Sequence, residues 1–218
     1  MNIFFDTEFT GLQKDTDLIS IGLISENNDV FYAEITDYDQ QKLNPWLFAN
    51  VIKNLSIENF KSATTKFNIE HYRAPFSIIS RELNEWLERI SDWKHIQFVS
   101  DCCWYDQVLL FDLITNRKTA LDVPYFISPV VLDICYLIMM TLSKNKRNDY
   151  ASQISVSLLI RAAFNTDRIR LLKFLNTVYT THVDVEDMNV ILGNCEHNAL
   201  YDALVIKNLF DILNKANE

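Results

Sequence analysis

Glycine and proline are scarce in this chain of 218 residues, which contains three glycines and four prolines. Their scarcity excludes collagen-like repeats, linker-rich sequences and glycine-rich phosphate-binding loops. No Walker loop is present. Apolar residues make up 49% of the chain and charged residues 22%, which are ordinary values for a protein that buries a core. The length favours a single domain over residues 1–218.

The chain also lacks an excess of positive charge. Its formal net charge is −9, so no global positive field attracts nucleic acid or an anionic membrane, and any phosphate partner must be bound locally. The longest apolar stretch, at 130–142, contains Asp133 and is shorter than the about 20 residues of a membrane span. The N-terminus lacks a basic segment and a cleavage site, which predicts a cytoplasmic protein.

Paired cysteines at metal-ligand spacing are missing as well. The four cysteines show no C-x-x-C pattern, which argues against a zinc site or a redox motif. We expect all four to be reduced thiols, and they are Cys102, Cys103, Cys135 and Cys195.

Hydrophobic periodicity predicts an α/β or α+β sheet protein that begins with a three-strand meander and continues with mixed strands and helices. The expected strands are 2–6, 17–25 and 30–35 for the meander, followed by 96–99 and 126–132. The expected helices are 45–55, 76–90, 107–114, 133–142, 155–164, 169–179 and 199–213. Asp133 and Asn198 are the expected N-caps of the helices that follow them.

Two acidic residues lie on the first predicted strand. Asp6 and Glu8 are two positions apart, so they point to one face with Cα atoms about 6.6 Å apart, and their carboxylates can converge on one cation. Phe5, Thr7 and Phe9 point to the opposite face. The alternative is a surface strand that carries solvated acids.

Two further patterns follow later in the chain. Tyr105 and Asp106 come after a strand, at the start of a helix, where a capping aspartate would explain them equally well. His197 and Asp202 inside one helix would lie about 140° apart and could not share a site. With Asn198 as N-cap, however, His197 lies in the preceding loop and Asp202 in the opening turns, and both can reach one cleft.

In this order, the three patterns resemble the motifs of the DEDDh 3′→5′ exonucleases, a superfamily with a ribonuclease-H-like fold. The resemblance implies the α/β class, with a mixed sheet, made of an antiparallel three-strand meander plus parallel strands, that is flanked by helices. The matching residues are 5–12 (FDTEFTGL), 104–106 (WYD) and 197–203 (HNALYDA), and the resemblance covers roughly residues 1–110 and 195–212. Within the superfamily, the chain is most similar to the small bacterial exoribonuclease branch first described from mycobacteria. Asp101 is a rival to Asp106 as the second-motif acid, and about 143–194 is an expected helical region atypical of the family.

Convergence of four carboxylates is unfavourable without cations, because each pair 4 Å apart repels by up to about 4 kcal/mol at an effective dielectric constant near 20. Oxygen-only ligands favour Mg²⁺ or Mn²⁺ over zinc. The resemblance implies two such ions, with Asp6 bridging both, Glu8 and Asp202 completing the first site and Asp106 supporting the second. It implies His197 as general base, a role that suits an unperturbed imidazole pKa near 6.5.

The resemblance also implies the substrate and the assembly. The expected substrate is single-stranded nucleic acid with a free 3′ end, RNA more than DNA, degraded to nucleoside 5′-monophosphates, and the expected assembly is a homodimer. Expected substrate-binding residues are Thr7, Phe9, Thr10, Leu12 and Trp104. The alternatives are a DNA-directed exonuclease, an inactive nuclease-fold protein that binds nucleic acid, and a phosphatase of the haloacid-dehalogenase type.

Overall fold

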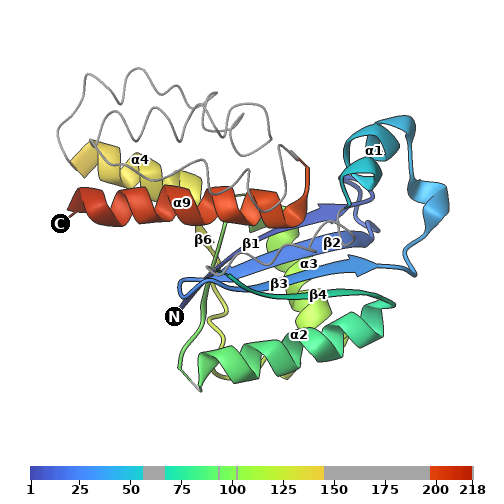
Figure 1. The fold of residues 1–218 in the computed structure, drawn as a ribbon, viewed down its shortest axis with the longest axis horizontal. Helices are drawn as coiled ribbons and strands as arrows, with labels where there is room; N and C mark the ends of the chain where they lie inside the picture. Colours follow the sequence, from blue (N-terminus) through green and yellow to red (C-terminus); the bar gives the residue numbers. More distant parts are fainter. Residues whose placement is uncertain (56–66, 93, 102, 145–196, 218) are drawn as a thin grey trace.

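A computed structural model describes residues 1–55, 67–92, 94–101, 103–144 and 197–217, and shows one mixed six-stranded sheet with helices on both faces (Figure 1). The strands are β1 Asn2–Phe9, β2 Leu18–Ser25, β3 Asp29–Ile35, β4 Asn68–Ala74, β5 Gln97–Ser100 and β6 Leu132–Asp133. The helices are α1 Pro45–Asn50, α2 Phe76–Ser91, α3 Cys103–Thr115, α4 Ile134–Lys144 and α9 Ala199–Asn217. Short 3₁₀ turns are η1 Gln40–Lys42, η2 Ile52–Asn54 and η4 Ala120–Asp122.

The sheet has the order β4-β3-β2-β1-β5-β6. Strands β1, β2 and β3 form the predicted antiparallel meander, whereas β4 pairs in parallel with β3, β5 with β1, and β6 with β5. The α/β class and the mixed sheet predicted from the sequence are therefore confirmed, and the arrangement is consistent with a ribonuclease-H-like fold.

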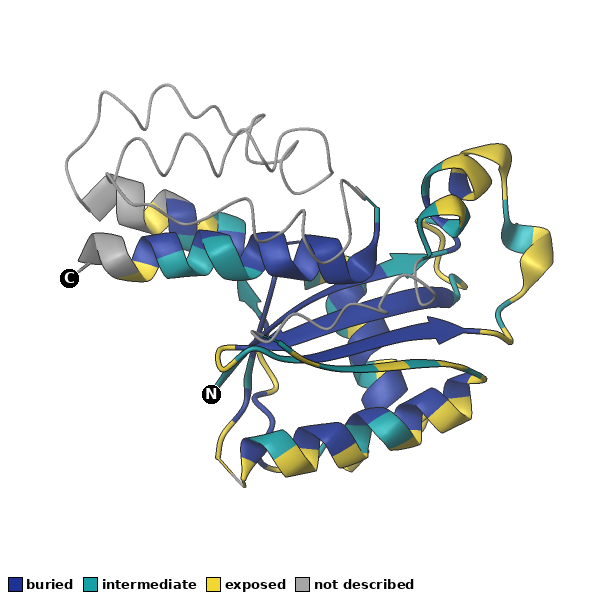
Figure 2. Ribbon diagram, in the orientation of Figure 1, coloured by how far each residue is buried: buried dark blue, intermediate teal, exposed yellow. Residues whose placement is uncertain are grey.

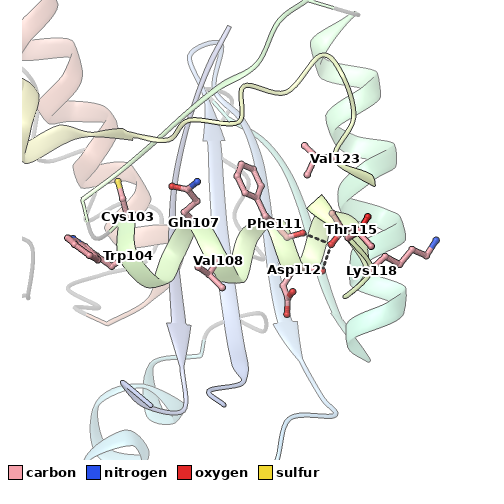
Figure 3. Close-up of a pocket in the computed structure, with 10 residues that line it drawn as sticks. Cys103, Trp104, Gln107, Val108, Phe111, Asp112, Thr115, Lys118 and Val123 are labelled. Atoms are coloured by element: carbon pink, nitrogen blue, oxygen red, sulfur yellow. Dashed lines mark hydrogen bonds between the residues drawn. The ribbon is translucent and has the colours of Figure 1, made fainter. Parts of the chain in front are cut away.

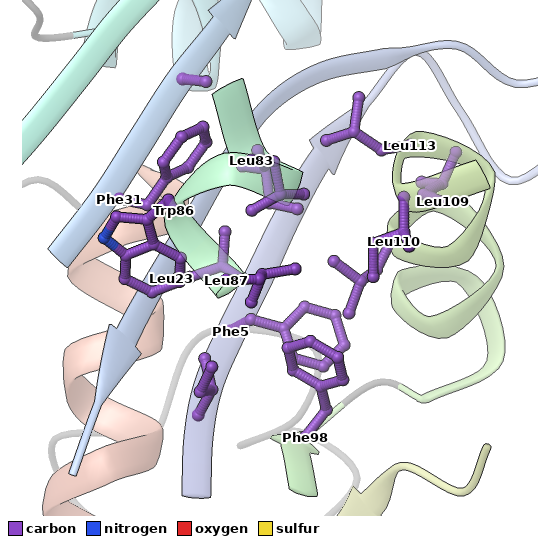
Figure 4. Close-up of a cluster of buried hydrophobic side chains, with 14 of the residues drawn as sticks. Phe5, Leu23, Phe31, Leu83, Trp86, Leu87, Phe98, Leu109, Leu110 and Leu113 are labelled. Atoms are coloured by element: carbon purple, nitrogen blue, oxygen red, sulfur yellow. The ribbon is translucent and has the colours of Figure 1, made fainter. Parts of the chain in front are cut away.

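Strand β1 is buried on both faces. Phe4 points to the side covered by α9 and α4, and Phe5 to the side covered by α2 and α3. On the second side, Phe5 packs with Phe98, Trp86 and Leu110 in one cluster (Figure 4). Each such apolar side chain contributes about 1.5–3 kcal/mol when fully buried. Figure 2 shows the resulting pattern, with a buried central sheet and exposed residues on the outer sides of α1 and α2.

Four elements differ from the sequence-based expectations. The polar edge strand β4 was not predicted, because only backbone pairing with β3 and a half-buried pattern define it. The strand predicted at 126–132 is wrong in extent: a single bridge at Ile127 and the two residues of β6 pair with neighbours, and Pro129 between them has no N–H to donate. Helix α3 begins at Cys103, four residues before the predicted start, and α1 ends at Asn50 before the turn η2.

The predicted N-cap at Asp133 is confirmed, since its side chain accepts a hydrogen bond from the Tyr136 amide at 2.9 Å. The helices predicted at 155–164 and 169–179 lie outside the described residues. Among the helices of the described segments, none has the length and apolar character needed to cross a membrane.

Candidate active site

Three carboxylates meet where β1 approaches the start of α9. Asp6, Glu8 and Asp202 each offer one oxygen atom, and these atoms all lie within 4.8 Å of one another. Asp6 is 5% exposed and Asp202 2% exposed, while Glu8 is partly buried. The alternative of a surface strand with solvated acids is therefore wrong for Asp6.

A glycine on β2 allows α9 to approach this closely. Gly22 pairs with Asp6 across the two strands, and a Cβ atom on Gly22 would lie 2.4 Å from both the Cα and the N atom of Leu200. Real Cβ atoms do not approach backbone this closely. Any side chain at Gly22 would consequently push the first turn of α9, including Asp202, away from β1.

Asn198 caps α9, as predicted. Its Oδ1 atom accepts hydrogen bonds from the amides of Leu200 and Tyr201 at 3.1 and 3.3 Å. Asp202 therefore lies in the first turn of α9, and His197 lies in the turn before the cap with a left-handed φ of 64°. The helix N-terminus favours the negative charge of Asp202.

A second group of carboxylates shares Asp6 with the first. Oxygen atoms of Asp6, Asp101 and Asp106 all lie within 4.8 Å of one another. Strand β5 runs parallel to β1, so the C-terminal ends of both strands meet at one edge of the sheet. Asp101 follows β5 directly, and Asp106 lies in the first turn of α3. The structure thus places both rival second-motif acids beside Asp6.

Hydrogen bonds hold the Asp106 carboxylate at both oxygens. Thr7 donates from Oγ1 to one oxygen, and Ser100 donates from Oγ to the other at 2.7 Å. Asp106 is 1% exposed, and Thr7 is 4% exposed. These bonds fix the direction in which Asp106 presents its lone pairs.

The negative charge of the site affects a neighbouring thiol. Burial, and then the charges of Asp133, Asp106 and Asp101, raise the pKa of Cys103 to about 12. Cys103 is therefore a neutral thiol at physiological pH and a poor nucleophile.

The carboxylate clusters fit hard divalent cations such as Mg²⁺ or Mn²⁺. Their carboxylates supply only oxygen donors, and Asp6 is common to both clusters.

His197 has an aromatic neighbour that the sequence did not predict for the site. Its ring contacts Trp46 of α1 edge-on, with ring centroids 5.0 Å apart and an angle of 85° between the planes. Trp46 is 54% exposed. The sequence predicted a helix that includes Trp46 but gave no role to this residue. Its contact with His197 could not be predicted, because the two residues are far apart in the chain.

The five predicted substrate-binding residues lie in different environments. Thr7 donates to Asp106, and the buried Thr10 accepts a hydrogen bond from the Asp17 amide at 2.9 Å. Phe9 is half-buried and stacks on Tyr105, with ring centroids 5.3 Å apart. Leu12 and Trp104 are 64% and 86% exposed. The structure therefore leaves the side chains of Leu12 and Trp104 most open to a ligand.

A pocket of about 600 Å³ lies along α3 (Figure 3). It begins at Cys103 and Trp104 and extends past Phe111 to Lys118 and Val123. Its described lining residues include none of the five predicted catalytic residues, which are Asp6, Glu8, Asp106, His197 and Asp202.

Comparison with known proteins supports a relationship to exonucleases over part of the chain. No family model matches the sequence. A segment of 55 residues is 34% identical to a 3′-5′ exoribonuclease of Mycobacterium tuberculosis, with the same values for the proteins of two strains. The segment is 25% of this chain and 33% of the relative, so the match spans about one third of the relatives' length.

Proposed function

We propose that this chain is a metal-dependent 3′→5′ exonuclease that hydrolyses single-stranded nucleic acid, RNA in preference to DNA, to nucleoside 5′-monophosphates. The observation that carries the proposal is that two clusters of three carboxylates each have Asp6 in common. The partial similarity to an exoribonuclease independently supports the same chemistry. The fold alone would not, because one fold hosts many activities.

The acidic residues would hold two divalent cations, Mg²⁺ or Mn²⁺. Asp6, Glu8 and Asp202 would bind one ion, and Asp6 with Asp106 would bind the other, with Asp101 beside them. When bound, such ions stabilise the negative charge that develops on the attacking and leaving oxygens of a phosphodiester. They would also supply the positive charge that a chain of net charge −9 lacks.

The remaining residues would orient groups and move protons. A ring nitrogen of His197 would accept a proton from the attacking water, since an unperturbed imidazole is largely neutral at pH 7. Thr7 and Ser100 would keep Asp106 in one orientation through their hydrogen bonds to its two oxygens. Thr7 thereby acts through Asp106, although the sequence suggested it as a substrate contact.

The 3′-terminal nucleotides would contact the exposed side chains near the end of β1. Trp104 and Leu12 offer apolar surface to a base, and base–aromatic stacking contributes about 1–3 kcal/mol per base. Phe9 would help to fix the position of Leu12, because Phe9 stacks on Tyr105 and the Tyr105 hydroxyl donates to the Leu12 carbonyl.

The test is a time course with 5′-labelled single-stranded RNA and a DNA of the same sequence, in Mn²⁺, Mg²⁺ or EDTA. We expect a ladder that shortens from the 3′ end, requires the metal and is lost in Asp6→Ala. Glu85→Ala is the matched control, because Glu85 is an exposed acid on α2. Faster cleavage of DNA would favour the DNA-directed alternative. Binding without turnover would favour the inactive nucleic-acid-binding protein, and phosphate release from small phosphomonoesters would favour the phosphatase.

A further inference from the structure

A buried polar network connects the loop of His197 to strand β3 of the sheet. Asn198 donates through Nδ2 to the Tyr32 hydroxyl at 3.2 Å and to the Asn54 carbonyl at 2.9 Å. The Tyr32 hydroxyl in turn donates to Glu34 at 3.2 Å. Tyr32 and Asn198 are 0% exposed and Glu34 is 2% exposed, so water does not compete for the two bonds among these three side chains.

The hydrogen-bonding capacities of these groups permit one orientation of Asn198. The Tyr32 hydroxyl has one proton, which it donates to Glu34, so it can only accept from Asn198. The Asn198 amide then uses both N–H groups toward Tyr32 and Asn54, and its oxygen accepts from the two amides of α9. A flipped amide would point its oxygen at the Asn54 carbonyl and its N–H groups at backbone donors.

The network begins at Tyr32, which lies in the same line of paired residues across the sheet as Asp6. Asp6 on β1 pairs with Gly22 on β2, and Gly22 pairs with Tyr32 on β3, so the three residues lie side by side across the sheet. Tyr32 therefore ties the cap of α9 to the row of Asp6 through one side chain. The other Asn198 donor is bound to η2, which follows the helix that carries Trp46.

His197 is the residue next to this anchored cap. Its left-handed φ of 64° is unfavourable for a residue with a side chain, so surrounding contacts must maintain it. Two such contacts are the edge-on ring contact with Trp46 and the link to Asn198, whose side chain is bonded to the first turn of α9. We propose that Asn198, Tyr32 and Glu34 are positioning residues that hold His197 in register with the carboxylates around Asp6. The catalytic part of this proposal rests on the proposed exonuclease function.

Two substitutions that preserve shape test the network. Asn198→Asp retains an oxygen that caps α9 but removes both side-chain donors, and Tyr32→Phe removes the hydroxyl while keeping the ring. Tyr72→Phe is the matched control, because Tyr72 on the edge strand β4 also donates to a glutamate, Glu70, at 3.0 Å. Steady-state kinetics on RNA give kcat and KM separately, and amide hydrogen exchange reports on Leu200 and Tyr201.

We expect both network variants to lower kcat by about 10- to 100-fold, the effect of a displaced general base. We expect KM to change by less than about threefold, because the substitutions displace the proposed general base His197 and leave the substrate contacts in place. Exchange at Leu200 and Tyr201 should accelerate in Tyr32→Phe, where the cap loses its anchor, whereas the carboxylate of Asn198→Asp still caps both amides. The control should resemble the wild type in kcat and in this exchange. Equal losses in the control, or an unchanged kcat despite faster exchange, would overturn the proposal.

A wild-type protein without metal-dependent turnover would refute the proposed function, and the positioning claim would then be judged separately. The imidazole proton resonances of His197 in nuclear magnetic resonance spectra serve this purpose. They should shift in both network variants and remain in place in Tyr72→Phe. Unchanged His197 resonances in Asn198→Asp would overturn the network by themselves.

Discussion

Gly22→Ala is the substitution for which the structure predicts the clearest effect. The added Cβ atom would lie 2.4 Å from the Cα and N atoms of Leu200 and 2.6 Å from the carbonyl carbon of Ala199. Carbon atoms pack at about 3.5–4.0 Å, so the first turn of α9 must move by about 1 Å. Neither partner is a flexible side chain, so the clash cannot be relieved by a rotamer change.

The expected cost follows from overpacking a buried contact. Inserting one methyl group into a packed interior destabilises by about 1–3 kcal/mol, which for a chain of this size lowers the melting temperature by about 2–12 °C. We also expect kcat to fall, because Asp202 and His197 move with the start of α9. A misplacement of about 1 Å costs about 100-fold in rate.

The assay combines thermal unfolding with kcat measured well below the melting temperature. Ala33→Gly is a control for backbone flexibility, since Ala33 lies on the adjacent strand β3 and points to the opposite face with α2 and α3. Gly22→Ala with wild-type melting temperature and wild-type kcat would refute the reasoning. Loss of stability without loss of kcat would refute only the link between this contact and the site.

Three further predictions concern the same region. Ser20→Ala should leave the melting temperature unchanged or raise it by about 2–4 °C, because the buried Ser20 hydroxyl has no hydrogen-bond partner among the described residues and removing it relieves about 1 kcal/mol; a clear decrease in calorimetry would contradict this. Mn²⁺ at 100 times its dissociation constant should stabilise the wild type by about 2.7 kcal/mol and Asp6→Ala far less, and equal stabilisation of both would count against a site at Asp6. Asp106→Asn should reduce kcat and Mn²⁺ affinity more than Asp101→Asn, because Thr7 and Ser100 orient Asp106; the reverse order in titration calorimetry would assign the second-motif role to Asp101.

The elements best predicted from the sequence are those whose own pattern is strong. The meander β1–β2–β3 combines apolar runs with a short polar turn, and α2 has apolar residues at helical spacing on its buried side. The cap at Asn198 was also predictable, because a short polar side chain before an apolar helix has a local function. In each case neighbours in the sequence determine the structure.

The less successful expectations concern elements that depend on distant partners. Strand β4 pairs with β3 through backbone atoms that no side-chain pattern reveals. Helix α3 begins before its apolar spacing becomes visible, since Cys103 and Trp104 do not mark a helix start. Strand β6 has only two residues, because its pairing stops where its partner strand β5 ends at Ser100.

The candidate site divides in the same way between local pattern and tertiary contact. The spacing of Asp6 and Glu8 and the order of the three motifs were present in the sequence, and together with the superfamily resemblance that they carry they predicted a divalent metal site. The burial of Asp6, the approach of α9 over Gly22 and the hydrogen bond from Thr7 to Asp106 came from the folded chain. Thr7 and Asp106 are 99 positions apart, and sequence spacing carries no information on such a contact. A repeating local pattern sets the type of an element, whereas the distances between carboxylates depend on how the sheet and helices pack.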